Sequence, residues 1–411
     1  MQNEQPAGPT RRSLRGLDWF IFFVADVQTG FGPFVAVYLT TQKWTQIDIG
    51  LVLTVGGLVS LAGQMPGGAV VDAARSERMV AGLAMAAIAI SAFAFAISPI
   101  FIVVLAAAVL HSAASCVLGP AIAAISLGLV GHDGISERLG RNARFSAIGN
   151  GLAAAAMGAC GYFLSVRAVF FVTAALLVPA LLMLRLIAPQ EIDAERAHGG
   201  PRERPAKLST EVLNVSRKRP LLIFAACVML FHLGNAAMLP LMGSVLTARS
   251  SQWATVMIAA SIVGPQLLVA VLSPWVGQKA RTWGRRPLLL AAFAALPVRG
   301  LFFATVTHPY LLVAAQLLDG VTAAVFAVMV PLVIADLTRG TGHFNLGQGI
   351  VGTTMGIGAS VSTTYAGYLS DHFGSSVAFL GLTAMATFGF VAMWALMPET
   401  GPVRHRATVV R

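Results

Sequence analysis

Long apolar runs separated by short polar breaks extend along the chain from residue 16 to residue 397. Each run is about as long as the roughly 20 residues that an α-helix needs to cross about 30 Å of hydrocarbon. We count twelve runs, at approximately 16–40, 48–71, 79–97, 100–130, 144–165, 168–187, 220–246, 253–276, 287–306, 309–337, 346–370 and 376–397. The pattern predicts an all-α membrane protein with twelve transmembrane helices.

The composition agrees with this prediction. Of the 411 residues, 56% are hydrophobic and only 11% are charged, which leaves too little polar surface to cover a soluble domain. The net charge of +11 would indicate nucleic acid binding in a soluble protein, but membrane topology accounts for it here, and we expect no nucleic acid partner. Cys116, Cys160 and Cys227 lie in apolar runs and are interpreted as small core residues, not as a disulfide or metal framework.

One long charged segment divides the runs into two groups of six. It occupies residues 188–218 and contains proline and glycine, as is typical of a solvated linker. We therefore predict an N-terminal six-helix bundle at 1–187, a cytoplasmic linker at 188–218 and a C-terminal six-helix bundle at 219–411.

Basic residues accumulate in alternate loops. If both termini are cytoplasmic, the outside loops hold only Lys43, Arg167 and Arg249, and nearly all other basic residues lie inside. Such a bias toward cytoplasmic arginine and lysine orients membrane proteins. We expect a multi-pass protein of a bacterial-type inner (plasma) membrane with both termini in the cytoplasm.

The two groups of helices resemble each other. A shift of 207 residues places Pro33 on Pro240, Gln28 on Asn235 and Arg78 on Arg285. One offset near half the chain length, with six helices in each half, predicts two parallel repeats related by an axis along the membrane normal.

The loop after the second run carries a recognisable pattern. Gly68-Ala69-Val70-Val71-Asp72, followed by Arg75 and Arg78, resembles the Gly-x-x-x-Asp-(Arg/Lys)-x-Gly-(Arg/Lys) signature of the major facilitator superfamily. The segment Gly277 to Arg286 resembles its counterpart in the second half, with Arg281 in place of the acid. The resemblance covers essentially the whole chain and implies that family's twelve-helix fold.

In that family the signature loops form a cytoplasmic gate, in which the acid meets a helix N-terminus and basic residues of the other half. The resemblance therefore implies gating roles, and an ordinary loop that only sets topology is the alternative. The residues concerned are Gly68, Asp72, Arg78, Gly277, Arg281, Gly284 and Arg285. The fifth run, with Gly149, Gly151, Gly158 and Gly161, resembles the glycine-rich fifth helix of antiporters in the family but lacks its Gly-Pro pair, and close helix packing explains it equally well.

The family architecture implies that the first, fourth, seventh and tenth helices line a central cavity. Each carries a titratable residue that we expect to be buried within its apolar run: Asp26, His111, His232 and Asp319. By helical rise each lies about 15 to 18 Å from the start of its helix, so we expect all four at one level. Ionisable residues at this depth are costly and mark transport pathways or coupling sites.

An acid among apolar side chains favours its neutral, protonated form, so that proton binding can drive a conformational cycle. We assign proton coupling first to Asp26 and second to Asp319. A charge on Arg299 within the membrane requires a negatively charged partner. A structural ion pair between Arg299 and Asp319 is therefore the alternative to proton coupling by Asp319. Asp48 and Asp336 lie at helix ends and are interpreted as boundary residues.

Polar residues near these groups are the candidates for substrate binding. They are Gln28, His111, His232, Asn235, Gln316 and Arg299. Helical spacing places Gln316 beside Asp319, Asn235 beside His232 and Ser115 beside His111. For each histidine, the alternative is a satisfied core residue.

These observations indicate a proton-coupled secondary active transporter of a small organic solute that works by alternating access. We favour export by antiport; proton-driven uptake by symport is the runner-up, and transport of a divalent metal or a metal chelate is a lesser alternative. The sequence lacks the Gly-x-Ser-x-Gly, His-Glu-x-x-His, Walker and Cys-x-x-Cys patterns of common enzyme sites, so we predict no enzyme activity, no cofactor and no resident metal. The expected partners are the solute, protons and the lipid bilayer, and we expect a monomer.

Overall fold

The computed structural model describes residues 8–201, 218–249 and 254–401. These residues form helices with no strand among them, as the apolar pattern predicts, so the all-α fold class is confirmed. The helices are α1 (Arg11–Thr41), α2 (Gln46–Ala73), α3 (Glu77–Ile97), α4 (Phe101–Phe163), α5 (Val166–Ala175), α6 (Leu177–Arg185), α7 (Ala194–His198), α9 (Arg219–Asn235), α10 (Met238–Arg249), α11 (Ala254–Trp283), α12 (Arg286–Thr305), α13 (Pro309–Thr338), α14 (Phe344–Phe373) and α15 (Ser375–Leu396). A short 3₁₀ helix, η1, covers Pro189–Glu191. The predicted linker at 188–218 lies outside the described residues from 202 to 217.

These helices make twelve membrane passes. Among the described residues, nine helical stretches are long and apolar enough to cross a membrane. One of them, α4, has 63 residues, which is long enough for two passes. The two passes within α4 meet at Gly131, whose φ of +65° suits glycine. With α1 and α14 the count reaches the twelve that the sequence predicts.

Two passes are built from consecutive shorter helices. α5 and α6 meet at Leu176, three residues before Pro179, and α9 and α10 meet at Ala236 and Ala237, just before Pro240. Proline removes a backbone N–H and crowds the carbonyl group four residues earlier, which explains both breaks. The predicted polar connection at 131–143 is wrong: only Gly131 leaves the helical conformation, and the rest of that segment is helical.

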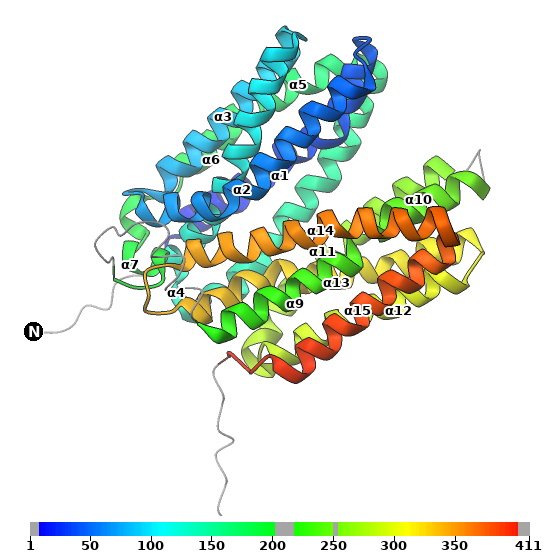
Figure 1. The fold of residues 1–411 in the computed structure, drawn as a ribbon. Helices are drawn as coiled ribbons and strands as arrows, with labels where there is room; N and C mark the ends of the chain where they lie inside the picture. The colour runs from blue at the N-terminus through cyan, green and yellow to red at the C-terminus, as the bar shows by residue number, and fades with distance from the viewer. Residues whose placement is uncertain (1–7, 202–217, 250–253, 402–411) are drawn as a thin grey trace, which may run out of the picture.

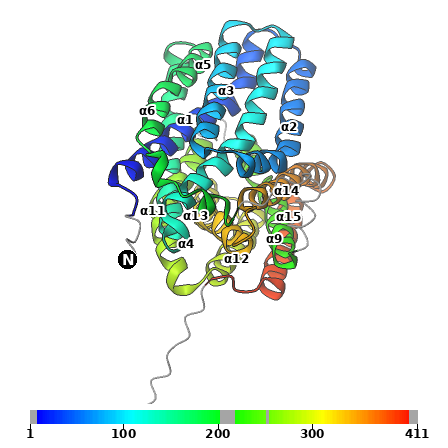
Figure 2. The same cartoon turned by 90° about the vertical axis from the view of Figure 1, so that its left-hand side faces the viewer.

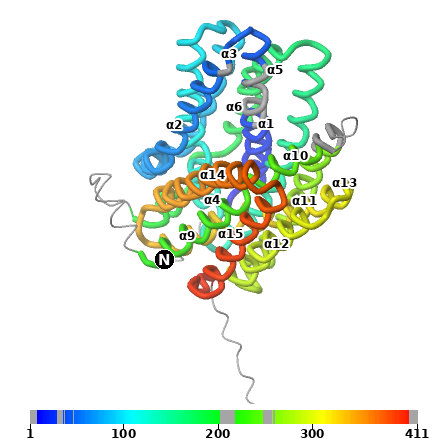
Figure 3. The backbone as a smooth tube through the Cα atoms, turned by 45° about the vertical axis from the view of Figure 1, so that its right-hand side comes forward, coloured from blue at the N-terminus to red at the C-terminus, as the bar shows by residue number. Residues whose placement is uncertain are grey.

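The helices form two bundles, α1–α6 and α9–α15 (Figure 1). α7, the start of α1 and the end of α15 lie at one end of the molecule, which we call the linker end (Figure 1). The ribbons of the two bundles diverge toward the opposite end, where α5 and α10 lie (Figures 1 and 3). In Figure 2 the bundle of α1–α6 lies above the bundle of α9–α15 and packs on it. The bundles contact each other mainly where α2 packs on α14 and where α4 packs on α11.

Glycines allow this contact at the linker end. A Cβ atom at Gly68 of α2 would lie 2.1 Å from the carbonyl oxygen of Asn345, at the start of α14. A Cβ atom at Gly277 of α11 would lie 2.4 Å from the carbonyl oxygen of Ser136 on α4. Small residues let helix backbones approach closely within membranes, so glycine at these two positions allows the bundles to meet closely.

We expect Gly68→Ala to separate α2 from α14, because the added methyl group would meet backbone atoms that cannot rotate away. The measurement is labelling of a cysteine placed at Gln348, in a background without native cysteines, by a membrane-impermeant maleimide added from the linker side. Labelling should increase several-fold. Gly50→Ala, on the same helix with no atom within 4 Å of the added Cβ, should leave it unchanged. Equal labelling in the two variants would contradict the packing role of Gly68.

Candidate functional site

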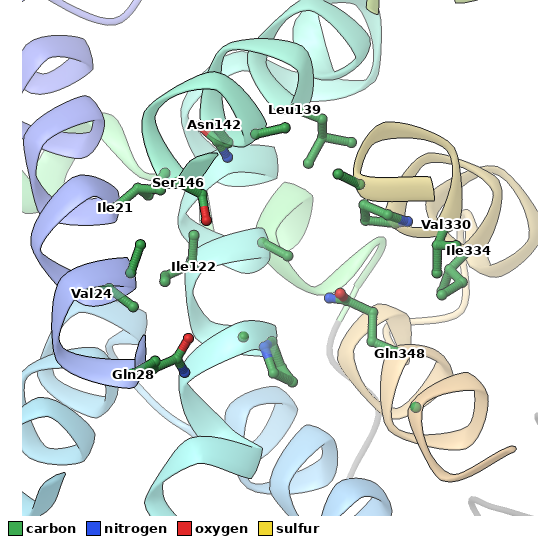
Figure 4. A pocket seen from close by; sticks show the side chains of 18 of the residues that line it. Ile21, Val24, Gln28, Ile122, Leu139, Asn142, Ser146, Val330, Ile334 and Gln348 are labelled. Carbon is green, nitrogen blue, oxygen red and sulfur yellow. The ribbon is translucent and has the colours of Figure 1, made fainter. Parts of the chain in front are cut away.

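A central cavity of about 350 Å³ lies between the two bundles (Figure 4). Its walls come from α1, α2 and α4 of the first bundle and from α13 and α14 of the second. Most of the lining is apolar, and the polar side chains in it are Gln28, Gln64, Asn142, Ser146 and Gln348. Ligand sites of membrane bundles are built in this way, from inward side chains on facing helices with few polar groups among many apolar ones.

A second cavity of about 390 Å³ adjoins the first and lies in the C-terminal bundle. The two cavities share four lining residues, Ala327, Val330, Pro331 and Met355. The second cavity is lined by His232, Asn235 and Asp319, together with the rings of Phe231 and Phe326. The titratable candidates of the second half therefore border the central space.

Arg299 of α12 organises the polar groups of this second cavity. Its side chain is 2% exposed. It forms an ion pair with Asp319 and donates a hydrogen bond to the Oδ1 atom of Asn235. The guanidinium group also lies 5.9 Å from the centre of the Phe303 ring. The Arg299–Asp319 pair considered in the sequence analysis is present, and Asn235, a substrate-binding candidate, is one of its partners.

Asp26 lies apart from these groups, within the N-terminal bundle. The central cavity is lined on α1 by Ile21, Val24, Ala25 and Gln28, at the spacing of one helix face, and Asp26 is not part of that lining. Asp26 is 6% exposed. Within the described part of the chain its Oδ1 atom has no hydrogen-bond partner, and no basic group forms an ion pair with it.

The two histidines also occupy different places. His232 borders the second cavity, and its ring contacts the rings of Phe231 and Phe326 at centroid distances of 5.6 and 6.0 Å. His111 lines a separate cavity of about 200 Å³, bounded by α1, α2, α3 and α4. The structure therefore does not bring the four titratable residues into one cavity. Helical rise predicts only a depth, and the faces of α1 and α4 that carry Asp26 and His111 do not line the two central cavities.

Gln316 differs from the other amide candidates. It is fully buried on α13, one helical turn before Asp319. Among the described residues neither its Nε2 nor its Oε1 atom has a hydrogen-bond partner, and it does not line the two central cavities. Gln28 does line the central cavity, opposite Gln348 (Figure 4).

At the linker end, Asp72 joins the bundles. It accepts hydrogen bonds from the backbone N–H of Leu346 at 2.8 Å and from the Nδ2 and backbone N–H of Asn345 at 2.8 and 3.3 Å. A carboxylate at the N-terminus of a helix satisfies free N–H groups and interacts favourably with the helix dipole. Asp72 thus caps α14 of the other bundle.

Sequence reasoning missed His198, which lies beside Asp72. It is the last residue of α7 in the linker, it is 2% exposed, and its Nδ1 and Nε2 atoms lie 3.5 and 3.1 Å from carboxylate oxygens of Asp72 and Glu77. Burial lowers the pKa of His198, but the two carboxylates raise it more, to about 9. A single helical turn within a charged linker gives no periodic signal from which this contact could be predicted.

The second signature loop makes a different contact. Arg281, at the position of the missing acid, forms an ion pair with Glu137 of α4 at 2.6 Å, and both side chains are about half exposed. Gly284, with φ of +89°, forms the turn between α11 and α12. Arg285 stays within its own bundle, where it pairs with Asp336 at 2.9 Å and donates to the carbonyl oxygen of Ala280.

Two basic residues occupy positions that the sequence does not predict. Arg78 lines a separate pocket at the linker end, and within the described ranges it forms no ion pair with the other bundle. Arg138, counted with the loop arginines of the inside, is 4% exposed and pairs with Asp18, which also binds Arg141 at 2.5 Å. Asp18 lies near the start of α1, and sequence analysis did not single it out because helix ends often carry solvated charges.

We expect the contact of His198 with Asp72 and Glu77 to give the protein a pH-dependent stability. Because the pKa of His198 rises from 6.5 to about 9, its stabilisation is complete below pH 6.5 and is lost as the pH rises through 9. The melting temperature of the purified protein, measured from about pH 6 to pH 10, should fall by a few degrees over this range. In His198→Gln the melting temperature should fall less over this pH range, because the ionic contact is absent. In His308→Gln, a change at an exposed position, the melting temperature should fall as much as in wild type. An unchanged pH profile in His198→Gln would contradict the ionic contact.

Comparison with known proteins agrees with this architecture. The family model described as Major Facilitator Superfamily matches residues 19–298 and 227–410. An uncharacterised MFS-type transporter of Mycobacterium tuberculosis is 38% identical over 401 residues, which cover 95% of this chain and 94% of the relative. The class B tetracycline resistance protein of Escherichia coli is 30% identical over 131 residues, or 31% of this chain and 32% of that protein.

The fold also resembles solved structures. The crystal structure of the fucose:proton symporter FucP of Escherichia coli matches with a TM-score of 0.73 and 13% identity, over 93% of this chain and 97% of that one. The chain therefore belongs to the major facilitator superfamily and is a multi-pass membrane protein with the fold of that family's transporters.

Proposed function

We propose that the protein is a proton-coupled secondary active transporter that exports a small organic solute by antiport. It works by alternating access as a monomer in a bacterial plasma membrane, with both termini and the linker in the cytoplasm. The halves 1–187 and 219–411 act as the two moving bundles, joined by the linker at 188–218. The central cavity lined by both bundles is the observation that carries the proposal.

Contacts that can break at the linker end support alternating access. The cap of Asp72 on α14 and the ion pair between Arg281 and Glu137 both join one bundle to the other. The pair of Arg281 and Glu137 is half exposed, and breaking it costs little, since an exposed ion pair contributes about 0 to 1 kcal/mol. Release of both contacts would open the cavity toward the linker end.

Asp26 is the proposed proton carrier. It is buried, and no cation in the described part of the chain compensates a charge on it. Its charged form is therefore disfavoured in the bundle, and proton binding and release change the charge inside the first half. Asp319 is the second candidate, because its protonation would release Arg299 from the ion pair between them.

The cavity favours a small organic solute with hydrogen-bonding groups. Amide and hydroxyl side chains face mostly apolar walls, and the charge of Asp319 is balanced by Arg299. Similarity to the class B tetracycline resistance protein over 31% of the chain supports export. Proton-driven uptake is the runner-up. Transport of a divalent metal or chelate comes last, since no group of three or more His, Cys, Asp or Glu residues that could hold a metal ion lies within the described ranges.

We expect Asp26→Asn to leave the protein inserted but to abolish transport driven by a proton gradient, because the amide cannot bind and release a proton. The first measurement is growth of an efflux-deficient host on toxic organic compounds, amino-acid analogues, chelators and metals. Wild type should protect against at least one compound, and Asp26→Asn should not. Asp371→Asn, an exposed acid at the end of α14, is the matched control and should protect like wild type.

Proteoliposomes then separate coupling from folding. Asp26→Asn should still exchange solute across the membrane without a gradient, whereas uptake or export against a solute gradient should be lost. Gradient-driven transport at the wild-type rate would overturn the assignment of Asp26. Sensitisation of the host by wild type, in place of protection, would reverse the proposed direction and favour the symporter.

The Arg299–Asp319 pair can be tested by a double variant. Arg299→Met or Asp319→Leu alone leaves an unpaired charge in the membrane and should destabilise the protein by about 3–5 kcal/mol. The combined variant removes both charges and should recover most of the lost thermal stability. Transport should remain absent in it, because Asp319 borders the cavity. Wild-type transport by the stable double variant would show that the pair only holds the structure together.

A further inference from the structure

A pocket with two arginines lies at the linker end of the N-terminal bundle, away from the central cavity. It has a volume of about 380 Å³ and lies between the start of α3 and the end of α6. Arg78 comes from α3 and Arg185 from α6. The remaining lining residues are Ser76, Met79, Leu181, Leu184 and Pro189.

Among the described residues, no protein group balances the positive charge of this pocket. No carboxylate is among its lining residues. In the described part of the chain neither Arg78 nor Arg185 forms an ion pair, and the Nε atom of Arg78 is buried without a hydrogen-bond partner. Nearby acids are engaged elsewhere: Glu77 contacts His198, and Glu191 accepts a hydrogen bond from Thr10 at 2.9 Å. A buried guanidinium donor without an acceptor is costly, so an anion would complete the pocket.

The surface around the pocket continues into the lipid-facing side of the bundle. Met79 and Leu83 of α3 are 58% and 63% exposed, and Leu182 of α6 is 50% exposed. α3 and α6 approach each other closely here, because a Cβ atom at Gly82 would lie 3.3 Å from Leu184. The two arginines therefore lie where an apolar face meets the end of the helices, at the depth of lipid headgroups.

We propose that this pocket binds an anionic phospholipid, with the headgroup phosphate between Arg78 and Arg185 and the acyl chains along Met79, Leu83 and Leu182. A phosphate offers several acceptor oxygens to the two guanidinium groups, and arginine binds phosphate with paired hydrogen bonds. Basic pockets between transmembrane helices are suited to acidic lipid headgroups. The site does not depend on the transported solute or on the direction of transport.

The test uses the full-length protein in a neutral detergent, with lipid binding followed by native mass spectrometry. The probes are phosphatidylglycerol, phosphatidylcholine and inorganic phosphate. Wild type should prefer phosphatidylglycerol. The double variant Arg78→Gln, Arg185→Gln should bind it roughly 25-fold more weakly, since each basic residue near an anionic lipid contributes a factor of about five. Arg75→Gln, an exposed arginine outside the pocket, is the matched control and should bind like wild type.

Each other outcome would overturn the proposal. Unchanged binding of phosphatidylglycerol by the double variant would show that the lipid binds elsewhere. An equal loss in Arg75→Gln would show that total charge, and not the pocket, attracts the lipid. Displacement of phosphatidylglycerol by millimolar inorganic phosphate would assign the pocket to a soluble phosphate compound. Melting temperatures in phosphatidylcholine, expected to be equal for all variants, confirm that each one is folded.

Discussion

The cost of a charge inside hydrocarbon constrains this structure more than any other interaction. A buried ion must be paired, neutralised or exposed to a water-filled space. Arg299 meets this requirement with Asp319 and Asn235, Asp18 with two arginines, and Arg285 with Asp336. Asp26 has no such partner among the described residues. In the proposed transport cycle, that difference separates the ion pairs, which hold helices together, from Asp26, which changes its charge.

The two halves share a fold but not their chemistry. The C-terminal half places an ion pair beside its cavity, whereas the N-terminal half holds Asp26, which forms no ion pair among the described residues. The two contacts between the bundles at the linker end also differ in their chemistry. Asp72 is held by N–H groups of α14 and by His198, whereas Arg281 and Glu137 form a half-exposed pair that salt screens. We therefore infer that the Asp72 contact contributes more to closure of the linker end than the Arg281 contact does.

The fold could be predicted from the sequence, but the contacts between helices could not. Apolar runs predicted the number of passes, because hydrocarbon thickness sets helix length. Helical rise predicted the depth of His111 and Asp26, but a depth does not say which neighbouring helix a side chain faces. The bond of Arg299 to Asn235 and the position of His198 depend on tertiary packing. The segment at 131–143 was assigned to a loop because its residues are polar, although one glycine is enough to separate the two helices.

Packing suggests how a proton at Asp26 would act on the gate. A Cβ atom at Gly149 of α4 would lie 2.5 Å from the carbonyl oxygen of Phe22 and 3.1 Å from the Cβ of Ala25, so α1 and α4 are in close contact beside Asp26. α4 also carries Glu137, the partner of Arg281 in the other bundle. Close-packed interiors transmit small displacements, since they do not deform continuously. In the proposed cycle, a change of charge at Asp26 shifts α1 against α4 and thereby strains or relieves the Glu137 contact, without any need for Asp26 to touch the solute.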